Sequence, residues 1–118
     1  IRDQDAMTPT TALLITGSAE LASLVRPLAA GIPALSLETA PGVDDAGKHL
    51  ERPEVAFVLV HLDGSKGIGA DDAARLLRLV LGVRRPIATV ALDDRHTPET
   101  ALALLRQGAA DYLSRPLD

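Results

Sequence analysis

The sequence has 118 residues, of which 47% are hydrophobic, and this length and composition fit one globular domain with a single core. Twelve basic and sixteen acidic residues give a net charge of −4, which argues against direct binding to a nucleic-acid backbone. With 2% aromatic residues and no cysteine, the chain lacks base-stacking platforms, disulfides and thiolate metal sites. No apolar run is long enough to span a membrane and no signal pattern opens the chain, so we expect a cytoplasmic protein without membrane contacts.

Short apolar runs predict five strands, separated by four helices. We expect residues 1–11 to be a disordered lead-in and residues 12–118 to form the domain. The predicted strands are residues 12–16, 32–37, 55–60, 86–92 and 109–114. The run 55–60 is apolar at every position, as expected for a central strand covered on both faces.

Helix signals lie between these runs. Ser18 is a plausible N-cap, and the helix after it should end at Gly31. A short helix is predicted over 44–51, another begins near Asp71, and the last begins at Thr97 and ends at Gly108. The apolar face expected for the first helix comprises Leu21, Leu24, Val25 and Leu28.

Strands that alternate with helices predict an α/β fold, in which a parallel sheet is covered by helices on both faces. In such sheets, ligands bind at the carboxyl ends of the strands. Those ends lie at residues 16–17, 38–39, 61–63, 91–94 and 114–116.

The last eleven residues, GAADYLSRPLD (108–118), resemble the fifth strand and the lysine-proline turn of response-regulator receiver domains. This resemblance implies a three-layer, doubly wound, flavodoxin-like fold with five parallel strands in the order 2-1-3-4-5. Receivers end in a further helix that packs beside the first one. We expect this chain to lack that helix, which would leave apolar residues of strands one and three exposed.

The resemblance also implies a site, because receivers accept a phosphoryl group on an aspartate at the end of strand three. The family's acidic, metal-binding pair corresponds to Thr16 and Gly17. The phosphoacceptor position falls on His61, or on Asp63 if the alignment slips by two residues.

The family's remaining site positions are altered in part. Its strand-four hydroxyl corresponds to Ala91, its switch aromatic to Tyr112, and its strand-five lysine to Arg115. We expect Arg115 to pair with Asp63, and His61 to bond to a loop carbonyl. Little of the catalytic set survives, which is the pattern of a degenerate, or pseudo-, receiver.

This pattern predicts a regulatory module of a bacterial response regulator that works without phosphorylation, cofactor or catalysis. Its partner would be a protein, an attached output domain or a second copy, bound at the helix after Thr97 and at the strand that holds Tyr112. One alternative is a genuine phosphoacceptor receiver of a phosphorelay, which would use Asp63 and Mg²⁺. Another is an α/β domain that binds a small anion. Asp63, Asp93 and Asp94 are weak candidates for a relocated cation site, against the simpler expectation of Asx-turns. No nucleophile-base pair for hydrolysis is evident.

Overall fold

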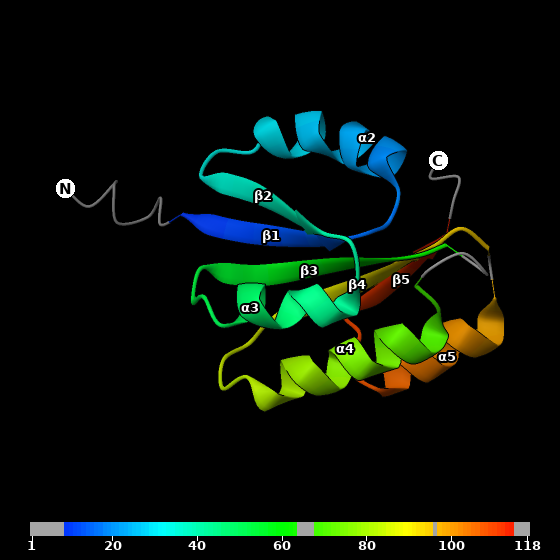
Figure 1. The fold of residues 1–118 in the computed structure, drawn as a ribbon. Coiled ribbons are helices and arrows are strands. Elements are labelled where there is room, and N and C mark those ends of the chain that lie inside the picture. Colours follow the sequence, from blue (N-terminus) through cyan, green and yellow to red (C-terminus); the bar gives the residue numbers. More distant parts are fainter. Residues whose placement is uncertain (1–8, 64–67, 96, 115–118) are drawn as a thin grey trace.

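A computed structural model describes residues 9–63, 68–95 and 97–114 (Figure 1). Its strands are β1 (Thr10–Ile15), β2 (Leu35–Ala40), β3 (Val55–Leu62), β4 (Ala88–Asp93) and β5 (Asp111–Ser114). Its helices are α2 (Ala19–Ala30), α3 (Ala46–Leu50), α4 (Ala70–Gly82) and α5 (Pro98–Arg106), with a 3₁₀ turn, η1 (Val43–Asp45), before α3.

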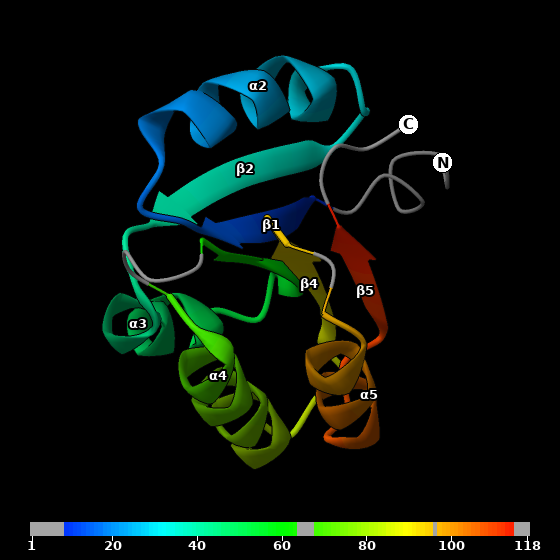
Figure 2. The same cartoon turned by 90° about the vertical axis from the view of Figure 1, so that its right-hand side faces the viewer.

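The five strands form one parallel sheet in the order β2-β1-β3-β4-β5, which confirms the predicted fold class. Helix α2 lies on one face of the sheet, and α3, α4 and α5 lie on the other (Figures 1 and 2). The larger core lies under these three helices and includes Val58, Val60 and Leu76. The smaller core lies under α2 and joins Leu14, Leu21, Ala22 and Leu92.

The start of β1 corrects the predicted lead-in. Thr10 and Thr11 already pair with Leu35 and Ser36 of β2, so the boundary expected at residue 11 was placed too late. Residues 1–8 of the expected lead-in lie outside the described residues. In the described part of the chain, no helix is both long and apolar enough to cross a membrane.

Strand β2 lies three residues later than the predicted run 32–37. Pro33 has no backbone N–H to give to a sheet, and Ala34 takes a positive φ of 61°. The N–H of Leu35 closes this turn on the carbonyl of Ile32 at 3.3 Å. The strand therefore includes Glu38, which an edge strand tolerates.

The apolar face predicted for the first helix is only partly buried. Leu21 is buried, whereas Leu24 and Leu28 are 56% and 72% exposed. Phe57 of β3 is 50% exposed, so the expectation that this strand is covered on both faces is wrong at this position. Strand β1 differs, because Leu14 is fully buried beneath α2. One helix shields only part of this face of the sheet (Figure 2).

Candidate functional site

Three side chains meet through hydrogen bonds at the carboxyl ends of β1, β3 and β4. His61 lies near the end of β3 and is 1% exposed, while Thr16 follows β1 and Asp94 follows β4. The His61 Nδ1 is 2.7 Å from the Thr16 Oγ1, and its Nε2 is 2.8 Å from the Asp94 Oδ1. The imidazole therefore bridges the ends of two other strands. We call Thr16, His61 and Asp94 the histidine bridge.

The donors and acceptors of the histidine bridge are mutually consistent. A carboxylate only accepts, so the His61 Nε2–H donates a hydrogen bond to the Asp94 Oδ1. In the tautomer that carries its proton on Nε2, Nδ1 accepts a hydrogen bond from the Thr16 hydroxyl. The Thr16 oxygen also accepts the backbone N–H of Ser18 at 3.0 Å. Both ring nitrogens of His61 thus have a hydrogen-bond partner. The expectation that His61 bonds to a loop carbonyl is wrong, because a hydroxyl and a carboxylate are its partners.

Helix α2 begins directly beside this bridge. Ser18 has the extended backbone of an N-cap, and its Oγ accepts the N–H of Leu21 at 3.1 Å, as predicted from the sequence. Through the Ser18 N–H, the start of α2 is tied to Thr16 and hence to His61. The position of this helix is therefore coupled to the ends of β3 and β4.

Asp63 lies at the same edge but does not join the bridge. A Cβ added to Gly17 would lie 3.9 Å from the Asp63 Oδ2, so this carboxylate reaches over the turn between β1 and α2. The Asp63 N–H donates to the carbonyl of Ile68 at 3.2 Å. Its Oδ1 is buried and has no hydrogen-bond partner among the described residues. Arg115, the partner expected from the sequence, lies outside the described residues.

Asp93 holds Tyr112, the residue that we expected at the switch position. The Tyr112 hydroxyl donates to the Asp93 Oδ2, and the N–H of Thr97 approaches the same hydroxyl oxygen at 3.3 Å. Burial raises the pKa of Tyr112, and the hydrogen bond to Asp93 raises this pKa further. The Asp93 Oδ1 accepts the N–H of Arg95 at 3.1 Å, which is the Asx-turn expected for this residue. Ala91 is buried beside Tyr112 in the register of β4 and β5, and its methyl group offers no hydroxyl.

The three aspartates predicted as weak cation ligands do not gather into one site. Asp93 binds Tyr112, Asp94 binds His61, and Asp63 faces Gly17. Within residues 9–63, 68–95 and 97–114, no group of three or more histidine, aspartate or glutamate side chains is placed to hold a metal ion.

The two hydrogen bonds of the histidine bridge were not predicted from the sequence. Its hydroxyl, imidazole and carboxylate stand in the order of a hydrolase triad, although no nucleophile-base pair was evident from the sequence. Thr16 is only 7% exposed, and its oxygen already accepts the Ser18 N–H, so a substrate has little access to it. The available signal was that Thr16, His61 and Asp94 all come at strand ends of a parallel sheet.

The fold of the chain matches many solved structures of receiver domains. The signal receiver domain of a protein assigned as a Luxo repressor in Vibrio parahaemolyticus superposes with a TM-score of 0.77 at 21% identity, over 93% of this chain and 81% of that one. A response regulator receiver protein from Pseudoalteromonas atlantica gives 0.74 at 14% identity, over 92% and 86%. The pilus assembly protein CpaE from Caulobacter crescentus gives 0.70 at 22% identity, over 93% and 85%.

No family model and no curated protein matches the sequence. At the identities of the structural neighbours, the likeness establishes the fold. The fold is that of the response-regulator receiver domains, as the C-terminal motif indicated.

Proposed function

We propose that this chain is a receiver-like signal-transduction module of a bacterial response regulator, that it is cytoplasmic, and that its state does not depend on an aspartyl phosphate. The observation that carries the proposal is the histidine bridge. The resemblance assigns the phosphoacceptor position to His61, and both ring nitrogens of this residue are engaged by Thr16 and Asp94. Side chains of the chain itself thus complete the site that a phosphoryl group would use.

The chemistry of phosphoryl transfer supports this reading. An aspartyl phosphate forms when a metal ion offsets the charge of the transferring oxygens, and carboxylates must hold that ion. Thr16 and Gly17 stand where the family's acidic pair is expected, and neither can supply an anionic ligand. Ala91 likewise lacks the hydroxyl that would bind the phosphoryl oxygen. Three separate contributions to the reaction are therefore missing.

Two neighbouring aspartates hold the loop after β4 from both sides. Asp93 accepts a hydrogen bond from the Tyr112 hydroxyl, and Asp94 accepts one from the His61 Nε2. The Asp94 N–H also donates to the carbonyl of Leu62 at 3.0 Å. We expect these bonds to keep Tyr112 and the start of α5 in one arrangement without any phosphoryl group.

The module would act through protein contacts, as dimerisation or control of an attached output domain. Apolar side chains are exposed on α5 and β5, the surface expected from the resemblance. Leu102, Leu105 and Leu113 are 50%, 44% and 38% exposed. A protein partner would remove these side chains from water, which is the main favourable contribution to most associations.

A further helix would suit the face of the sheet that α2 covers only in part. Phe57 of β3 and Leu24 and Leu28 of α2 all remain at least half exposed on the described residues. A helix in the place of the last receiver helix would pack on these side chains. We therefore propose that the receiver-like domain, which begins with β1 at Thr10, takes such a helix on this face.

The second candidate function is a phosphoacceptor receiver that uses Asp63. One observation favours it: the buried Asp63 Oδ1 has no partner among the described residues, so this carboxylate has an unused acceptor. A bound Mg²⁺ would neutralise the charge of the transferring oxygens. Among the described residues, Asp63 belongs to no group of three or more histidine, aspartate or glutamate side chains that could hold a metal ion, which makes this function the weaker candidate.

Beryllofluoride, a mimic of the phosphoryl group, tests the proposal against this alternative. The chain would be titrated with beryllofluoride and Mg²⁺ while its amide spectrum is recorded. We expect no change at residues 61–63 or around Tyr112. Saturable shifts at both places that vanish in Asp63→Asn, but persist in the control Asp71→Asn on exposed α4, would establish the phosphoacceptor function instead.

A further inference from the structure

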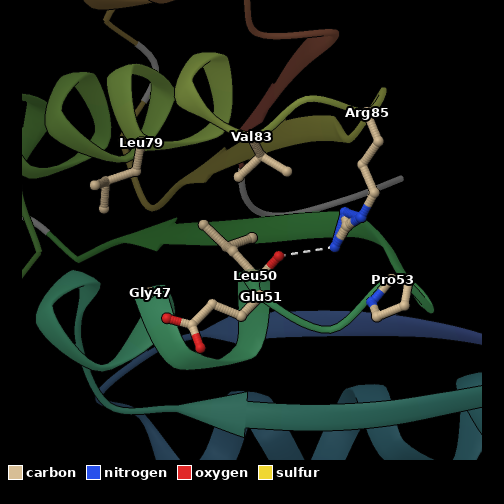
Figure 3. A pocket seen from close by; sticks show the side chains of 7 residues that line it. All are labelled: Gly47, Leu50, Glu51, Pro53, Leu79, Val83 and Arg85. Carbon is tan, nitrogen blue, oxygen red and sulfur yellow. Dashed lines mark hydrogen bonds between the residues drawn. The ribbon is translucent and has the colours of Figure 1, made fainter.

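A groove lies between α3 and α4 (Figure 3). Part of its lining, Pro53 and Arg85, precedes β3 and β4, whereas the histidine bridge lies at the carboxyl ends of these strands. The volume of the groove is about 640 Å³. Leu50 of α3 and Leu79 and Val83 of α4 are among the side chains that line it. Leu50 is a buried floor at 2% exposure, whereas Leu79 is 41% exposed. The folded chain therefore leaves an apolar surface in the groove, on which Leu79 stays partly exposed to solvent.

Gly47 lines the α3 side of the groove and has no side chain to extend into it. It lies inside a helix of only five residues, where glycine weakens the helix relative to alanine. A Cβ added at this position would meet no atom within 4 Å, so packing within the described residues does not require glycine here. The missing side chain leaves open space above Leu50.

Arg85 places a positive charge at the end of the groove. Its Nη2 donates to the carbonyl of Leu50 at 2.8 Å and to that of Arg52, which fixes the guanidinium at the end of α3. No carboxylate of the described residues pairs with this half-buried cation, and its Nη1 is buried without a hydrogen-bond partner among them. A held cation without a counter-charge attracts an anion.

We propose that this groove docks a segment of a partner protein that carries a leucine-like side chain beside a carboxylate. The apolar side chain would lie over Leu50 in the space left by Gly47, against Leu79. The carboxylate would face Arg85, while Glu51 on α3 would repel an acidic group placed at its own side of the groove. The two helices α3 and α4 flank the groove, which is open to the surface, and an open groove suits a protein segment better than a small ligand that needs enclosure.

Two short peptides test the charge preference on the complete chain. Acetyl-Ala-Leu-Glu-Ala-amide carries the proposed pair, and acetyl-Ala-Leu-Lys-Ala-amide reverses its charge. In titrations followed by amide spectra, we expect the acidic peptide to shift the signals of Leu50, Leu79 and Arg85. The basic peptide should bind about fivefold more weakly, as the loss of one exposed ion pair implies.

Two variants of Gly47 test the location. Gly47→Leu should fill the groove and weaken binding of the acidic peptide about tenfold, whereas Gly47→Ala, which fills less of this space, should weaken it less. Both substitutions add helix propensity, and a Cβ at this position meets no atom within 4 Å, so we expect the fold to persist, and thermal melts would check it. Arg85→Gln should abolish the difference between the two peptides.

Several results would overturn the proposal. These are shifts confined to other surfaces, equal binding of both peptides, or an unaltered affinity in Gly47→Leu. The small amphiphile 4-methylpentanoate is a further probe, and if it bound in the groove while the acidic peptide did not, a metabolite would be the occupant. None of these outcomes depends on the chemistry of His61, so the groove can fail independently of the proposed function.

Discussion

Replacing His61 with alanine tests how much the histidine bridge contributes to stability. The side chain is 1% exposed, so its removal leaves a cavity and deprives the Thr16 hydroxyl of its acceptor. A buried polar group left unsatisfied costs about 1–3 kcal/mol. With the cavity added, we expect the free energy of unfolding to fall by about 3–4 kcal/mol. Asp94 adds little to this loss, because its side chain is 38% exposed and can be hydrated.

The structure also predicts an order among variants of the bridge. Thr16→Val leaves the His61 Nδ1 and the Ser18 N–H without their partner, at a cost of about 2 kcal/mol. Asp94→Asn should cost less than about 1 kcal/mol, since an amide oxygen can still accept and the group is partly hydrated. His49→Ala is the matched control. Its side chain is 26% exposed, and its loss should cost less than about 1 kcal/mol.

Urea unfolding followed by far-ultraviolet circular dichroism measures these differences, because the chain has no tryptophan. The reasoning requires equal denaturant slopes, so that shifts of the midpoint report stability alone. A loss in His61→Ala no larger than that in His49→Ala would refute it. A larger loss of unfolding free energy in Asp94→Asn than in Thr16→Val would also refute it, because the losses would then not follow the burial of the side chains.

Three further predictions concern the surroundings of the site. Burial, and then the hydrogen bond to Asp93, raises the pKa of Tyr112 above its usual 10.0, so the neutral hydroxyl contributes stability below pH 10 and this contribution is lost as pH rises through the raised pKa. Phenolate absorbance should show Tyr112 ionising above pH 10, and at lower pH in Asp93→Asn; ionisation at or below pH 10 in the unaltered chain would contradict this. The pKa of Glu38 is lowered by hydrogen bonds, first from Arg52, so its contribution is present above pH 4.5 and lost as pH falls through the lowered pKa. Glu38→Gln should therefore flatten the acid limb of stability in urea unfolding, and an unchanged acid limb would exclude this role. Phe57→Ala should cost clearly less than the roughly 3–5 kcal/mol of a buried phenylalanine, because half of its surface is already exposed, and a loss in that range would mean that this face is covered.

The fold could be predicted because helix and strand patterns alternate without interruption. The apolar run that became β3 and the Ser18 cap of α2 are local signals, and both were read correctly. The place of β2 was read wrongly. Its position depends on the turn at Pro33 and Ala34, where φ is positive at a residue that is not glycine. Hydrophobicity alone carries no trace of such a turn.

The site could be predicted as a region but not as a set of bonds. Parallel strands bring Thr16, His61 and Asp94 to one edge, and the sequence placed all three there. Which side chains form hydrogen bonds depends on their rotamers and on the relative shift of neighbouring strands, both at a scale of about 1 Å. The spacing of residues in the sequence does not determine positions at this scale. Asp93 and Asp94 show the limit well, because adjacent residues of the same type bind different partners.

The prediction that the apolar face of α2 is buried failed for a different reason. A helical stripe predicts which residues share a face, and Leu21 and Leu24 indeed lie on successive turns. Whether those residues are buried depends on which other elements pack against that face. Among the described residues, the contacts cover only part of the apolar face of α2. The sequence of one helix cannot show how much of its stripe meets a neighbour.

The most direct test of the central claim is the intact mass of the chain after incubation with acetyl phosphate and Mg²⁺. A phosphorylatable receiver domain treated in parallel shows that the reagent is active. We predict that the mass of this chain stays unchanged, because Thr16, Gly17 and Ala91 cannot support the transfer and His61 is held within its own bridge. Addition of one phosphoryl group, lost in Asp63→Asn or in His61→Ala, would contradict a phosphorylation-independent module.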